Sequence, residues 1–205
     1  MTANHKCLRA ARSLAAALVG LLLASPAAGQ RGAITRPRNL PQLVEQAAVI
    51  LRGHVISARV EPHPELIHLS TVVVSMRVRE TLKGQAGSTF TFRQYIWDIR
   101  DRYESGGYKK GQELVLLMNA PTRYGLSSPA GLEQGRFRIL RDSEGREMAI
   151  NGYGNAGLFR DLGAQLARKG MRLSPRLSTL TSQDRARPVP LEDLRVLIRQ
   201  LAEVR

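Results

Sequence analysis

A glycine-rich segment, Gly152–Gly157, is the first candidate for chemistry, because it follows a predicted strand and precedes a predicted helix. Its Gly-x-Gly-x-x-Gly spacing is that of loops that bind a pyrophosphate at a helix N-terminus. Dinucleotide-binding proteins add a second parallel strand and an acidic residue about 20 residues further on. No such strand follows here, and Asp161 comes too early. The segment is therefore interpreted as a turn out of the strands, and the sequence predicts no cofactor.

Three histidines outside the first 29 residues, His54, His63 and His68, are the potential metal ligands. His63 and His68 flank a turn that also holds two glutamates, and two histidines with a carboxylate can bind zinc. The His-x-x-x-His and His-Glu-x-x-His patterns are both absent, and histidines beside prolines in a turn are more often solvated. We therefore predict no metal site.

Carboxylates and serines offer two further sets of catalytic residue types. Asp98, Asp101 and Glu104 have a spacing that suits acid–base chemistry or calcium binding, but basic residues lie among them and the calcium-loop pattern is missing. Ser127 lies in Gly-x-Ser-x-Pro, which lacks the last glycine of a nucleophile elbow. These residues predict a charged loop with local ion pairs and no catalytic set. A hydrolase with an unrecognised site stays open as an alternative.

Aromatic residues and arginines gather between residues 93 and 108. Tryptophan and tyrosine combine a large contact area with a polar tip, and with arginine they are enriched at binding hot spots. The alternative is that these aromatics belong to the core at one end of the strands. The candidate binding residues are Arg93, Tyr95, Trp97, Arg100, Arg102, Tyr103 and Tyr108.

The first 29 residues have the three parts of a cleavable signal peptide. Basic residues precede an apolar run, Leu14–Ala24, and small residues follow it. This run is shorter than the roughly 20 apolar residues that span a bilayer. The pattern predicts export to the periplasm or the exterior, with cleavage after Ala27 or Gly29 and no transmembrane segment in the mature chain.

Export would also remove the only cysteine, Cys7, and with it disulfides, thiol catalysis and cysteine zinc sites. The formal net charge of +14 suggests an anionic partner, although 26 of the 31 basic residues are arginine, a skew that nucleotide composition can also produce. No basic stripe with interleaved aromatics indicates nucleic-acid binding. We expect a protein, an anionic glycan or an envelope surface as the partner.

The middle of the chain alternates between apolar and polar residues with the period of half-buried strands, most clearly at residues 72–79. Gly53, inside the first apolar run, indicates a bulge or a close approach of two backbones. The predicted strands cover residues 49–60, 67–81, 88–97, 113–118, 135–140 and 147–151, with a hairpin turn at 142–145 between the last two.

Helices are predicted only at the two ends of this strand region. Asn39 can cap a short helix from Leu40 to Ala48, with a proline tolerated in its first turn. The predicted fold is mainly β, a small antiparallel OB-like barrel of five or six strands with one or two C-terminal helices. Along the chain we expect a signal peptide at 1–29, a flexible lead-in at 30–38, the barrel domain at 39–157, a helix at 158–170, a linker at 171–188 and an amphipathic helix at 189–205.

Three stretches carry a resemblance to known domains: Val49-Ile50-Leu51-Arg52-Gly53-His54-Val55, Arg79-Glu80-Thr81-Leu82-Lys83-Gly84 and Tyr108-Lys109-Lys110-Gly111-Gln112-Glu113-Leu114-Val115-Leu116-Leu117. In this order, over residues 40–150, they resemble bacterial exported domains with an OB-like barrel. The outline is similar to netrin-like modules and the tissue inhibitors of metalloproteinases. The resemblance implies a barrel and, as an alternative function, regulation of a secreted protease. Those inhibitors chelate zinc through an N-terminal cysteine that the mature chain lacks, so no functional residue is carried over, and a non-enzymatic binding module is favoured.

Overall fold

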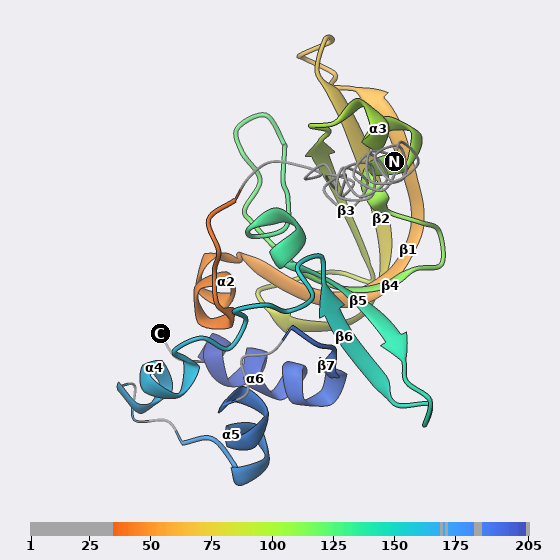
Figure 1. Cartoon of the computed structure of the whole chain (residues 1–205). Coiled ribbons are helices and arrows are strands. Elements are labelled where there is room, and N and C mark those ends of the chain that lie inside the picture. Colours follow the sequence, from red (N-terminus) through yellow and green to blue (C-terminus); the bar gives the residue numbers. More distant parts are fainter. Residues whose placement is uncertain (1–34, 169, 171, 183–185, 204–205) are drawn as a thin grey trace, which may run out of the picture. The chain divides into compact units, whose positions relative to one another are not determined.

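The computed structural model describes residues 35–168, 170, 172–182 and 186–203, and the predicted signal peptide lies outside them. The described chain is mainly β, with several short helices (Figure 1). Its strands form one antiparallel sheet in the order β3-β2-β1-β4-β5-β6-β7. Within the described residues, no helix is long and apolar enough to cross a membrane.

Six of the seven strands begin and end close to where the sequence predicts, and the last one is not predicted. They are β1 (Val49–Pro62), β2 (Ser70–Lys83), β3 (Thr89–Tyr95), β4 (Glu113–Met118), β5 (Arg136–Arg141), β6 (Glu147–Asn151) and β7 (Val189–Pro190). The helices are α2 (Leu40–Gln46), α3 (Ile99–Tyr103), α4 (Leu162–Arg168), α5 (Pro175–Ser182) and α6 (Leu191–Glu203), with 3-10 turns η1 (Ser105–Gly107) and η2 (Leu132–Gln134).

The antiparallel, mainly β architecture is confirmed, but a closed barrel is not seen. The sheet is open, because its order begins at β3 and ends at β7, and no pairing joins these two edges in the described part of the chain. The pairing of β1 with β2 contains three register shifts, one of them between Arg52 and Gly53. A Cβ atom at Gly53 would lie 2.4 Å from the Arg77 carbonyl oxygen, so the predicted close backbone approach is confirmed.

Strand β4 is buried on both faces, because its alternate side chains enter two different cores. Val115 and Leu117 point into the helix-side core, where the apolar faces of α2, α4 and α6 pack. Leu114, Leu116 and Met118 point into the strand-side core, which side chains from β2 and β3 complete. One face of the sheet is thus covered by helices. The other face is covered by strands β2 and β3, because the sheet curves back on itself (Figure 1).

Both terminal helices form as the sequence predicts. Asn39 caps α2, since its side chain accepts a hydrogen bond from the Gln42 amide at 3.1 Å and the Gln42 side chain accepts one from the Asn39 amide at 3.0 Å. The apolar stripe of α6 is buried in the helix-side core at Leu194, Leu197 and Ile198. Helix α6 is therefore part of the domain and packs on its sheet.

The segment after β6 differs from the prediction in three places. Helix α4 begins at Leu162, because residues 158–161 form turns and Asp161 has a left-handed φ of 57°. The expected linker at 171–188 contains α5, because Leu177 is buried in the helix-side core. Val189 and Pro190 form the short strand β7 beside β6, so α6 begins after them. A two-residue strand containing a proline leaves no periodicity in the sequence.

The close contact at Gly53 leads to a stability prediction. We expect Gly53→Ala to lower the free energy of unfolding by about 1–3 kcal/mol, because the added methyl group meets the Arg77 carbonyl. Gly87→Ala is the control, since the nearest atom to its added Cβ would be 3.8 Å away. Urea denaturation of both variants measures the difference, and equal stabilities would contradict the close approach.

Candidate functional site

Three loops meet where β1 and β3 end and β2 begins, and hydrogen bonds join them to one another and to these strands. The His63 Nε2 atom lies 2.8 Å from the Tyr124 carbonyl oxygen, which links the β1–β2 hairpin loop to the loop after β4. The Ile96 amide donates to the Ser70 carbonyl at 3.1 Å, and the Ser127 amide donates to the Arg93 carbonyl at 2.8 Å. We call residues 63–69, 96–104 and 122–127 together the loop end.

Exposed apolar and aromatic side chains gather at the loop end. It carries five of the eight large hydrophobic side chains that are exposed in the described residues: Leu66, Ile67, Trp97, Tyr103 and Tyr124. Tyr103 is 87% exposed, Ile67 67% and Trp97 60%. The Tyr95 and Trp97 rings pack edge to face with centroids 4.7 Å apart, which orients the indole. The predicted strand from residue 67 starts at Ser70 instead, so Ile67 lies in the hairpin loop.

The arginines beside this surface are held by neighbours. Arg93 pairs with Glu61 at 2.6 Å and donates to the Thr71 hydroxyl at 2.7 Å. The Arg100 Nε atom donates to Asp98, which also caps α3. The predicted local ion pairs are therefore present, and Asp101 and Glu104 also have interactions. Because the charges are balanced, the loop end presents contact area without a strong net charge.

The structure places six of the seven predicted binding residues around the loop end and the seventh, Tyr108, in the core. Tyr108 is buried, and its hydroxyl donates to Gln94 Oε1 at 2.8 Å. Its ring packs edge to face on Phe92 and lies under the Arg136 guanidinium, 4.7 Å from the centroid. Burial raises the pKa of Tyr108 to about 12. Tyr108 is therefore a core residue that supports strand β3 from the interior of the domain.

His63 is buried, in contrast to the solvated histidine that the sequence indicates. Its Nδ1 atom accepts hydrogen bonds from the Glu65 and Leu66 amides, so a neutral ring donates from Nε2 to Tyr124. Both nitrogens are thus engaged in shaping the hairpin loop, whereas His68 is exposed. No group of three potential metal ligands occurs among the described residues.

The remaining candidates for chemistry are also engaged in local structure. The Ser127 hydroxyl donates to the Asn119 carbonyl at 2.8 Å. In the glycine-rich segment, every backbone N–H from Gly152 to Ala156 donates to an oxygen of the chain itself, two of them to Asn151 Oδ1. These groups are not directed at a phosphate, and the segment is a turn.

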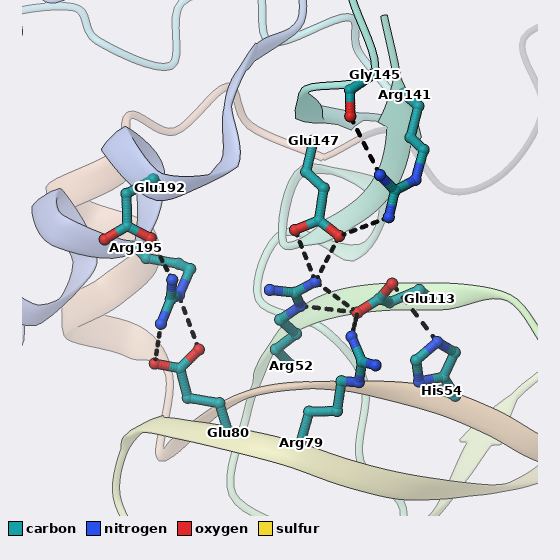
Figure 2. A network of polar contacts seen from close by, with 10 residues as sticks. All are labelled: Arg52, His54, Arg79, Glu80, Glu113, Arg141, Gly145, Glu147, Glu192 and Arg195. Atoms are coloured by element: carbon teal, nitrogen blue, oxygen red, sulfur yellow. Dashed lines mark hydrogen bonds and ion pairs between the residues drawn. The ribbon is translucent and has the colours of Figure 1, made fainter.

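An ionic network that the sequence analysis did not identify covers the sheet beside α6 (Figure 2). Arg52 is nearly buried and lies 2.8 Å from Glu113 and 2.9 Å from Glu147, so it joins β1 to β4 and β6. His54 and Arg79 also contact Glu113. The one signal for the network in the sequence is an arginine among apolar residues of a strand.

A second, separate group of ion pairs lies at Glu80, which binds Arg195 of α6 through two hydrogen bonds of 2.7 and 2.8 Å (Figure 2). Burial alone would raise the pKa of Glu80, but hydrogen bonds and charge from Arg195 and Arg199 lower it below its usual value. Each of these carboxylates already has cationic partners. The ion pairs of Arg52 join strands of the sheet to one another, and the Glu80–Arg195 pair joins the sheet to α6.

Known proteins give no further guidance to this site. Comparisons of the sequence with family models and curated proteins, and of the fold with solved structures, found no match. The properties of the loop end are therefore inferred from its own geometry. It presents exposed aromatic and aliphatic side chains on loops that hydrogen bonds hold together.

Burial of Tyr108 predicts how stability changes at alkaline pH. Because the folded-state pKa is raised from 10.0 to about 12, the unfolded phenol ionises first, and stability falls as the pH rises through this range. We expect a loss of roughly 2–3 kcal/mol by pH 12. Denaturant unfolding at a series of pH values should show it in the wild type and in Tyr103→Phe, and much less in Tyr108→Phe. The same fall in Tyr108→Phe would contradict this assignment.

Proposed function

We propose that this chain is an exported, non-enzymatic binding module and that the loop end is its contact surface. The gathering of five exposed apolar and aromatic side chains on three linked loops is the observation that supports this proposal. Exposed patches of this kind mark interaction sites, and tryptophan, tyrosine and arginine are the residues that dominate their energetics.

Hydrogen bonds between the loops favour this role, because a surface ordered before binding loses less entropy on association. Balanced charges at Arg93–Glu61 and Arg100–Asp98 favour a protein partner over a polyanion at this surface. Trp97 and Tyr103 would enter a pocket of the partner, with Arg102 at the rim.

The OB-like barrel and the netrin-like resemblance stay part of this proposal. They are supported by the curvature that lets side chains of β2 and β3 share a core with β4. Regulation of a secreted protease rests on the resemblance alone.

Photo-crosslinking in the native cell envelope tests the contact surface. We expect p-benzoylphenylalanine in place of Tyr103 to give one discrete adduct with an envelope protein, because this side chain is the most exposed at the loop end. Adding Trp97→Ala should reduce the adduct at least fivefold, which immunoblotting measures. The control position is Tyr153, an exposed tyrosine outside the loop end. Equal adducts from both positions, or no adduct from position 103, would contradict the proposal.

Export has a separate test. When the full chain is produced in a bacterial host, we expect a mature protein in the periplasm that begins at residue 28 or 30, as determined by mass spectrometry. Leu18→Arg should block processing, because a charge interrupts the apolar run. Leu194→Ala, a core change downstream, should leave the cleavage site unchanged. An unprocessed wild-type chain in the cytoplasm would refute export.

A further inference from the structure

A pocket of about 310 Å³ lies between the segment before α2 and the turn that precedes α4. Its walls come from parts of the chain that are more than 100 residues apart. The residues that line it are Arg36, Pro37, Arg38, Asn39, Gln42, Gly157, Arg160, Asp161 and Gln165. One wall is the end of the glycine-rich segment, whose amides from Gly152 to Ala156 are already used.

Three arginines share this small space with a single carboxylate. Arg36, Arg38 and Arg160 form no ion pair with another described residue, whereas Arg52 and Arg195 lie in saturated networks. Asp161 is the one acidic residue of the lining. The pocket therefore carries a local excess of positive charge in a concave site.

Buried amide side chains fix both walls of the pocket. Gln134 accepts a hydrogen bond from the Arg38 amide at 2.7 Å and donates to the Arg36 carbonyl at 3.1 Å, so it holds the first wall. The Gln134 carbonyl accepts from Asn151, whose side chain organises the glycine-rich turn with Asn155. These hydrogen bonds hold Arg36 and Arg38, which lie in the predicted lead-in, against Gln134.

Direct contacts complete this arrangement. The Asn39 side chain donates to the Arg160 carbonyl at 2.8 Å and so ties the second wall to the start of α2. The Arg38 guanidinium donates to Gln46 Oε1, which restricts its position at the rim. The backbone at Arg36, Arg38 and Arg160 is therefore fixed before any ligand arrives, which lowers the entropic cost of binding.

We propose that this pocket binds the oxyanion group of a small ligand, a phosphate or a carboxylate. The planar guanidinium group donates two parallel hydrogen bonds to either anion, and several arginines in a concave site strengthen this recognition. Gln165 adds an amide for the uncharged part of the ligand. The volume suits a ligand of about the size of one sugar ring. This site is separate from the loop end and does not depend on its role.

Calorimetric titration with three probes that share one sugar ring tests the site: glucose 6-phosphate, glucuronate and glucose. We expect at least one of the two anions to bind the mature wild-type protein and glucose not to bind. The anion that binds more tightly identifies which oxyanion the pocket prefers. Arg36→Gln with Arg160→Gln should weaken that binding at least tenfold, because two of the three guanidinium groups are lost.

Two matched variants separate recognition from overall charge. Arg59→Gln with Arg138→Gln removes the same charge from exposed strand positions and should leave the affinity unchanged. Asp161→Asn should tighten binding severalfold, and asparagine tolerates the left-handed φ at this position. Circular dichroism confirms folding of each variant. Failure of both anions to bind at about 10 mM (ten times the Kd of a millimolar site), or equal weakening in both double variants, would overturn the proposal.

Discussion

The structure depends on the burial of β4 on both of its faces. A strand in this position cannot be stable with helices on one side only, because Leu114, Leu116 and Met118 would then face water. The curvature of β1 and β2 brings β3 back over these side chains and closes the second core. That same curvature brings the ends of β1 and β3 and the start of β2 next to the loop after β4, and so creates the loop end.

Buried and partly buried polar groups connect the sheet to its surroundings in two distinct ways. Arg52 and Glu80 use charge, and their ion pairs join the strands to one another and to α6. Gln134, Asn151 and Asn155 use neutral amides, whose hydrogen bonds order the segment before α2 and the turn after β6. Removing a partner of Arg52 or of these amides would leave a buried group unsatisfied, which costs more than the hydrogen bond itself contributes. The hydrogen bonds of these amide side chains also determine the shape of the arginine pocket.

The fold was more predictable from the sequence than the site. Local signals such as the alternation in β2 and the cap at Asn39 predicted six strands and both terminal helices. These signals depend only on residues that are close together in the sequence. Curvature, β7 and α5 depend on contacts between distant segments. For the same reason Tyr108, grouped with exposed aromatics in the sequence, is a core residue, and the convergence of Arg36 with Arg160 carries no sequence signal at all.

Native-state hydrogen exchange of the protein tests the dependence on β4 most directly. If two-sided burial of this strand supports the domain, the amides of residues 114–118 exchange only through global unfolding, with the slowest rates in the chain. Amides at the β5–β6 turn and in β7 then exchange by local opening. Rates for residues 114–118 as fast as those of β7 would contradict this dependence on β4. The loop end and the arginine pocket would then lack the rigid sheet that positions them.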